Sequence, residues 1–151
     1  LAVVHRHHFA EMEINRGLGL RSVIGELSAN LRATAPEGSA RLSIVLEIDP
    51  YYVSQDTAVA VAFLTTELIE LAMSLSPASQ VRVSLKPGQD SGHAVLRINS
   101  PALIESDAMR EMMANRYGRV IEGLSRQLRS KLHHDPLIGA FEVVVAVIDR
   151  D

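Results

Sequence analysis

The chain is organised around one stretch, Asp56-Thr-Ala-Val-Ala-Val-Ala-Phe-Leu-Thr-Thr-Glu-Leu-Ile-Glu-Leu-Ala72. Its apolar residues cover nearly every face of a helix rather than a single stripe, and the same character continues to residue 75. A helix that is apolar all round is buried on most of its sides. We therefore predict a central helix over residues 57–75, with Ser54 or Asp56 able to cap its first turn.

Amphipathic segments flank this helix on both sides. The helical ones place apolar residues at spacings of three and four, as Val120, Ile121, Leu124 and Leu128 do, and the strands alternate apolar and polar residues. The predicted helices cover residues 1–9 (a helix tail), 20–32, 103–113 and 116–129, and the predicted strands cover residues 41–48, 81–85, 93–98, 132–134 and 141–148. Two hairpins among interleaved helices and strands predict a two-layer α/β sandwich, a mixed sheet covered on one face by helices.

Composition limits the classes of function. The 151 residues suffice for one domain, and a net charge of −3 with a pI near 6.1 argues against a nucleic-acid partner. Without cysteine there are no disulfides or thiolate metal sites. The longest apolar run, residues 58–64, is much shorter than a membrane span of about 20 residues. No signal peptide or initiator Met is present, so we expect a cytoplasmic piece of a longer protein, without membrane contact by this domain.

Residues 56–72 resemble the N-box helix of sensor histidine kinases, most closely the subfamily with HisKA_2 or HWE-like dimerisation helices. The flanking segments agree with this resemblance: residues 41–50 are similar to the strand before the N box, residues 20–31 to the preceding helix, and residues 124–130 to the helix after the second glycine box. The resemblance implies the Bergerat (GHKL ATPase) fold over residues 17–151. Residues 1–16 would then be the end of a dimerisation helix and a linker, and the phospho-accepting histidine would lie upstream of Leu1.

In that family ATP lies between the N-box helix and a flexible lid, and the N-box asparagine bridges Mg²⁺ to the phosphates. The resemblance places Leu71 at the asparagine position, and leucine offers no oxygen to a metal that requires oxygen ligands. Thr66 falls on the first asparagine of the pattern, and Ser74 falls where a basic residue usually follows. Glu67 alone keeps its family identity.

The two glycine boxes differ as well. Ile98 stands where the family's adenine-reading aspartate belongs, Asn99 follows it, and Ser100 and Ala102 replace the glycines. An isoleucine cannot accept the exocyclic amine of adenine. At the second box Tyr117 occupies a glycine position and Gly118 is out of register, although such a loop should direct backbone N–H groups at phosphates.

Other residues have both a functional and a structural interpretation. Glu67 and Glu70 could be catalytic carboxylates, but a solvated or capped helix face is the simpler interpretation. His5 and His8, like His133 and His134, lack the frame of a metal site, and neither His5 nor His8 is expected to accept phosphate. One remaining candidate is the methionine cluster, which either packs in the core or lid or forms an adaptable protein contact: Met109, Met112 and Met113. The other is a set of arginines, which forms either a solvated stripe or a site for phosphate or an acidic partner: Arg116, Arg119, Arg126 and Arg129.

Two functional hypotheses remain open. In the first, the chain is the ATPase-fold domain of a two-component histidine kinase with an impaired nucleotide site and no bound cofactor. It would contact a response regulator or a phosphotransfer protein, or pack on its own upstream dimerisation helices. In the second, it is an active kinase domain that binds ATP and Mg²⁺ in a divergent way, through Thr66, Glu67 and the arginines. A weaker third possibility is a module of the same fold from an anti-sigma or chaperone-like protein.

Overall fold

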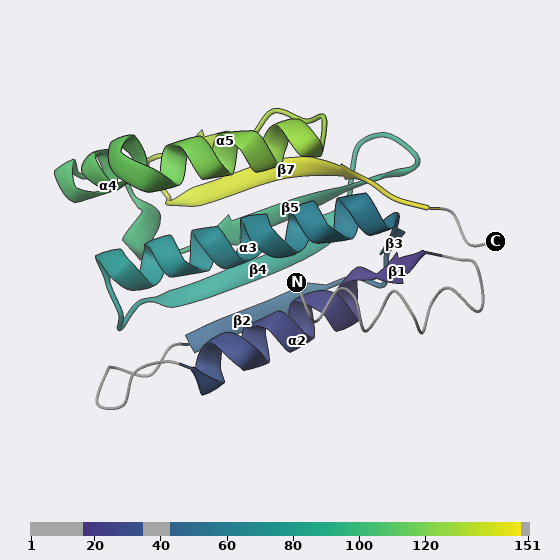
Figure 1. Ribbon diagram of the computed structural model, residues 1–151, viewed down its shortest axis with the longest axis horizontal. Coiled ribbons are helices and arrows are strands. Elements are labelled where there is room, and N and C mark those ends of the chain that lie inside the picture. Colours follow the sequence, from purple (N-terminus) through teal and green to yellow (C-terminus); the bar gives the residue numbers. More distant parts are fainter. Residues whose placement is uncertain (1–16, 35–42, 149–151) are drawn as a thin grey trace.

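A computed structural model describes residues 17–34 and 43–148. The predicted helix tail and linker of residues 1–16, including His5 and His8, lie outside the described residues, as do most of the loop before the first long strand and the last three residues. Figure 1 shows the long helices lying over a twisted sheet and running roughly along its strands.

Five strands form one mixed sheet in the order β2-β4-β5-β7-β6. β2 (Ser43–Ile48) runs parallel to β4 (Gln80–Pro87), and every other neighbouring pair is antiparallel. The strands β5 (His93–Asn99), β6 (His133–Asp135) and β7 (Ala140–Ala146) complete the sheet. Both predicted hairpins are confirmed.

Alternation along the strands separates the two faces of the sheet. Val83, Ile98 and Phe141 occupy neighbouring positions on β4, β5 and β7, and each is at most 1% exposed. The residues between them, such as Arg97 and Glu142, lie on the opposite face and pair across the strands at 3.7 Å. One face therefore belongs to the core, while the other carries charged pairs.

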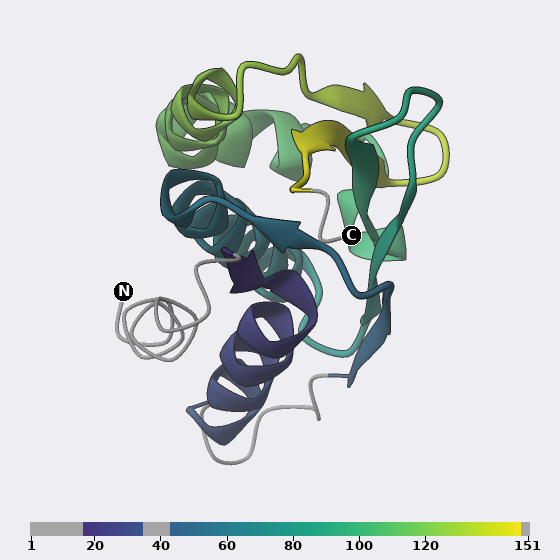
Figure 2. The same cartoon turned by 90° about the vertical axis from the view of Figure 1, so that its right-hand side faces the viewer.

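Three helices cover the apolar face: α2 (Leu20–Ala33), α3 (Gln55–Leu75) and α5 (Gly118–Gln127). Figure 2 shows them together on one side of the strands, which confirms the predicted two-layer α/β sandwich. α3 packs against α2, α5, β4 and β5, and this surrounding explains why it is apolar on almost every face. Ser54 caps it by accepting the backbone N–H of Thr57.

α3 is also the one helix of the described residues long and apolar enough to cross a membrane by length and composition. In the fold, 56% of its most apolar window is buried by the rest of the protein. The core therefore accounts for its hydropathy.

Several local predictions need correction. The helix expected over residues 103–113 is a 3-10 turn, Pro101–Leu103, followed by α4 (Asp107–Met112). A π turn, Met113–Tyr117, joins α4 to α5 without a break in helical backbone. The expected final strand ends at Ala146, and Val120, expected on the buried face of its helix, is 39% exposed. A two-stranded pair, β1 (Leu18–Gly19) with β3 (Tyr52–Val53), was not predicted at all.

Candidate functional site

α3 carries four of the candidate positions, and their exposure differs widely. Leu71 is completely buried within the hydrophobic core, whereas Ser74, one turn later, is exposed. Thr66 is half-buried. A core leucine is held by dispersion contacts with its neighbours and has no polar atom for a metal or a phosphate. The side chain at the family's metal-bridging position thus belongs to the packing of the domain.

Glu67 is the charged residue of α3 whose environment differs most from water. Its side chain is only 15% exposed, and Oε2 lies 4.0 Å from Nη2 of Arg116, the nearest cation, and has no hydrogen-bond partner among the described residues. Burial raises the pKa of the Glu67 carboxyl, the neighbouring Glu70 raises it further, and Arg116 opposes both. Of the two structural interpretations, a solvated or a capped helix face, the freely solvated one does not describe Glu67, which is largely shielded and lies beside Arg116 of the π turn.

Arg116 holds its place beside Glu67 through a second contact. Its guanidinium carbon lies 5.0 Å from the ring centroid of Tyr117, within the range of a cation–π interaction. Tyr117 itself is 6% exposed and belongs to the core. The Arg116–Glu67 pair therefore links the π turn to α3.

The end of β5 uses its polar side chains to hold the chain's own backbone. Ile98 is 1% exposed, between Val83 and Phe141 on the neighbouring strands. Asn99 donates its side-chain amide to the carbonyls of Ile138 and Gly139, at 2.9 and 3.2 Å. These contacts fasten the end of β5 to the β6–β7 turn. The side chain of Ile98 itself is apolar and offers no hydrogen-bond acceptor.

Ser100 and Ala102 follow in the 3-10 turn. Ser100 is fully buried, its hydroxyl accepts the N–H of Ala102, and its own N–H donates to Gly139. Gly139 has φ of +70°, and a Cβ there would lie 2.2 Å from the Ser100 carbonyl oxygen. The required glycine of this region is therefore in the β6–β7 turn rather than at the positions where the family pattern places glycines.

Gly118 lies in continuous helix instead of a phosphate-binding loop. Its N–H donates to the carbonyl of Met113 across the π turn, and its φ of −57° is ordinary for a helix. A Cβ at this position would come within 2.4 Å of that carbonyl oxygen. Glycine is thus required by the widened turn, and its N–H is engaged within the helix.

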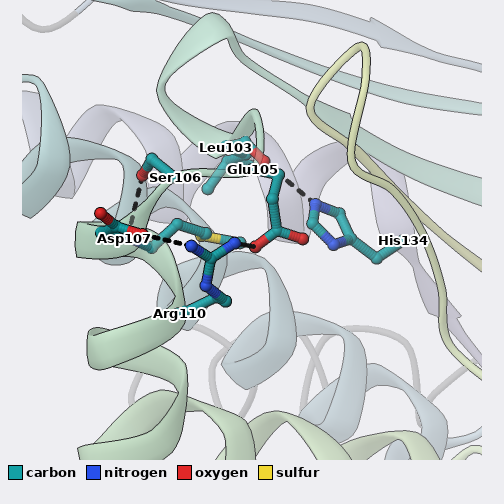
Figure 3. Close-up of polar contacts among 7 residues, drawn as sticks. Leu103, Glu105, Ser106, Asp107, Arg110 and His134 are labelled. Atoms are coloured by element: carbon teal, nitrogen blue, oxygen red, sulfur yellow. Dashed lines mark hydrogen bonds and ion pairs between the residues drawn. The ribbon is translucent and has the colours of Figure 1, made fainter.

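The segment between β5 and α5 is fixed by a polar cluster, shown in Figure 3. Arg110 pairs with Glu105 at 3.1 Å and with Asp107, and Ser106 caps α4 by accepting the N–H of Met109. The Nε2 of His134 lies 3.0 Å from the carbonyl oxygen of Leu103. The pairs of Arg110 and the Ser106 cap lie within this segment, and the contact of His134 with Leu103 joins it to β6. The resemblance would make this segment the lid.

The histidines, methionines and arginines can now be assigned. His134 stacks on Phe141 with ring centroids 4.2 Å apart, and no group of three metal-ligating side chains occurs in residues 17–34 and 43–148. Met109 is buried, and Met112 and Met113 are partly buried against the core, as the packing interpretation expects.

The predicted arginine stripe is not a single feature. Arg116 faces Glu67, and Arg126 pairs with Glu122 at 2.6 Å. Arg119 and Arg126 line a pocket between α5 and β6, whereas Arg129 lines another near the start of α3. Of the ten candidate nucleotide positions only Gly118 lines either pocket.

Comparison with known proteins adds the fold. No family model and no curated protein sequence matches the chain. Solved structures do: the Erythrobacter litoralis EL346 blue-light activated histidine kinase has a TM-score of 0.74 at 14% identity over 95% of this chain. The mycobacterial sensor histidine kinase MprB has a TM-score of 0.63 at 15% identity over 86% of the chain, and Acinetobacter baumannii AdeS one of 0.64 at 13% over 96%.

The chain spans 51% of the Erythrobacter kinase, 97% of the matched MprB chain and 75% of the AdeS chain. At these identities the similarity shows the fold. The five-stranded mixed sheet with its helices is therefore the fold of histidine kinase ATPase domains.

Proposed function

We propose that this chain is the ATPase-fold domain of a two-component sensor histidine kinase in which the nucleotide site is impaired. It acts through contact with a response regulator or a phosphotransfer protein, in a phosphotransfer or phosphatase role. The fold shared with histidine kinase domains supports the signalling half of this proposal. We further propose a cytoplasmic location and a junction with upstream dimerisation helices.

The burial of Leu71 is the observation that supports an impaired nucleotide site. A Mg²⁺ ion at this place would lose one oxygen ligand, and the leucine that replaces it belongs to the core. At the adenine end, an exocyclic amine facing Ile98 would be desolvated without an acceptor, at a cost of about 1–3 kcal/mol. Every 1.4 kcal/mol is a tenfold change in affinity, so the loss at the adenine end alone weakens nucleotide binding about 5- to 150-fold, and the missing metal ligand weakens it further.

A second candidate function rests on Glu67. Its shielded carboxylate beside Arg116 is the kind of environment in which active sites place a general base. In that alternative the domain is an active kinase that binds ATP and Mg²⁺ in a divergent way. Thr66 would supply a hydroxyl near the phosphates.

Titration calorimetry separates the two candidates. The chain is titrated with Mg-ADP and with a non-hydrolysable Mg-ATP analogue, and we expect no heat of binding at nucleotide concentrations up to about 1 mM. A dissociation constant in the micromolar range would refute the impaired site and support the divergent kinase. Far-UV circular dichroism of the same sample establishes that the titrated protein is folded.

A transfer experiment tests the signalling role. The full-length protein is incubated with labelled ATP. In a separate reaction it is incubated with a phosphotransfer protein from the same pathway that carries labelled phosphate. The expected pattern is loss of labelled phosphate from the phosphoprotein, by transfer to the protein or by hydrolysis, with no label taken from ATP. Label from ATP alone would favour the active kinase.

A further inference from the structure

A groove on the far side of α5 is distinct from the nucleotide positions. It lies between α5 and the edge strand β6, and its volume is about 780 Å³. We call it the α5–β6 groove; its defining residues are Arg119, Arg126, Lys131, Ile121, Leu132 and Phe141. Figure 1 shows α5 lying over β7, and β6, next to β7, is an edge strand of the sheet.

The groove is basic although the chain is acidic. Its walls carry three permanent cations against one carboxylate, Glu122, while the whole chain has a net charge of −3. Glu122 is already paired with Arg126 at 2.6 Å. Among the described residues neither Arg119 nor Lys131 forms an ion pair, so two unneutralised positive charges line the groove.

The floor is apolar and firm. Ile121 and Phe141 are core residues at 1% exposure each, and Leu132 and Met113 are half-buried beside them. His134, stacked on Phe141, closes one side. A ligand that fits must therefore combine negative charge with an apolar group that can cover Leu132 and Met113.

The dimensions suit an extended peptide. The wall formed by α5 between residues 118 and 126 is about 12 Å long at 1.5 Å per residue. An extended chain advances about 3.3 Å per residue, so roughly four residues would span it. β6 is one of the two edge strands of the five-stranded sheet, the other being β2, and the backbone groups of an edge strand can pair with an added strand.

We propose that the α5–β6 groove binds an extended acidic segment of a partner protein. Carboxylates on alternate residues of that segment face the groove and pair with Arg119 and Lys131, and the methylene groups of the same glutamate side chains pack on Leu132. The segment lies along β6 as an additional strand. This site uses none of the nucleotide positions except the backbone around Gly118, so it stands whether or not the nucleotide site is impaired.

Fluorescence anisotropy of labelled peptides tests the proposal. The probes are an eight-residue peptide of alternating glutamate and leucine and a matched peptide of alternating lysine and leucine. We expect the glutamate peptide to bind the full chain and the lysine peptide to bind at least tenfold more weakly. Equal affinities, or no binding of the glutamate peptide at 1 mM protein, would overturn the proposal.

Matched variants locate the site. The double substitution Arg119→Glu with Lys131→Glu should weaken the glutamate peptide at least tenfold. Arg82→Glu with Lys86→Glu makes the same charge change on β4, away from the groove, and should alter the affinity less than twofold. An equal loss in both double variants would mean general charge attraction and would refute the groove.

Two further readouts distinguish the occupant. Amide chemical-shift changes on adding the glutamate peptide should concentrate at Leu132 and β6, and changes confined to other strands would count against the site. Inorganic phosphate at 10 mM, with ionic strength matched by chloride, should not displace the peptide. Full displacement by phosphate would identify a small-anion site instead. Calorimetry with Mg-ADP is independent of all these outcomes, so a failed nucleotide proposal and a failed groove proposal remain distinguishable.

Discussion

Replacing Leu71 by asparagine restores the residue type that the kinase resemblance expects and tests whether this position is core or cleft. The two side chains have similar shape, so the substitution changes polarity more than volume. Losing a fully buried leucine forfeits about 1.5–3 kcal/mol of apolar transfer energy. Burying the new amide without partners adds about 1–3 kcal/mol, so unfolding should become easier by about 3–6 kcal/mol.

Urea denaturation measures this loss. The chain has no tryptophan, so the helical circular dichroism signal is the appropriate probe. With a slope of about 2 kcal/mol per molar urea, the midpoint should fall by about 1.5–3 M. Leu71→Met conserves volume and polarity and should cost less than about 1.5 kcal/mol. Ser74→Asn, on the exposed turn that follows, should stay within about 0.5 kcal/mol.

The reasoning is refuted if Leu71→Asn costs less than about 1 kcal/mol. In that case the side chain at position 71 faces water in solution, and the cleft between α3 and the β5 end is open. A gain of Mg-ADP binding in the same variant would show further that only this side chain separates the domain from a working site.

Three more predictions follow from single positions. The raised pKa of Glu67 means that the fold disfavours its charged form, so wild-type stability falls as pH rises above the ordinary value of 4.5. Glu67→Gln should therefore be more stable than the wild type at pH 7, and this advantage should disappear below pH 4.5. Thermal unfolding of both proteins across this pH range measures the difference. A stability advantage that does not change with pH would contradict the prediction. Gly139→Ala should cost more than about 2 kcal/mol of stability, because Gly139 has a positive φ and a Cβ there would meet the Ser100 carbonyl. Gly123→Ala, with open space at its Cβ, should instead stabilise the exposed helix by about 0.5–1 kcal/mol. Equal effects of the two substitutions in urea titrations would refute the requirement for glycine in the β6–β7 turn. Ser54→Ala removes the cap of α3 and should cost about 1 kcal/mol in the same titration, and an unchanged midpoint would show that water caps the helix equally well.

Periodicity predicted the long elements because it reflects burial directly. α3 is apolar all round and lies at the centre, and the alternation of β2, β4, β5 and β7 separates the two faces of the sheet. β1 and β3 escaped prediction because two-residue strands carry no period and exist only through pairing between distant segments. The π turn was missed because Asn115 and Gly118 suggest a break, while the burial of Tyr117 and Met109 keeps the backbone helical.

The candidate site divides in the same way. The resemblance located the N-box and glycine-box positions along the chain, and the fold places them at α3, the β5 end and the π turn. Their environment could not be foreseen: the approach of Arg116 to Glu67 and the use of Asn99 to hold the β6–β7 turn join residues far apart in sequence. The α5–β6 groove combines residues from two elements and the loop between them, and no linear motif marks it.

The sequence by itself determined the two-layer architecture, since hydrophobic spacing is a local property that any segment carries with it. It also determined which residue types stand at the positions of a kinase nucleotide site. Only the tertiary structure decided that Leu71 and Ile98 are core residues, that Glu67 is shielded beside an arginine, and that the four arginines of residues 116–129 do not form one stripe. Burial and electrostatic environment depend on what packs against a residue from elsewhere in the chain, and that information is absent from any single stretch of sequence.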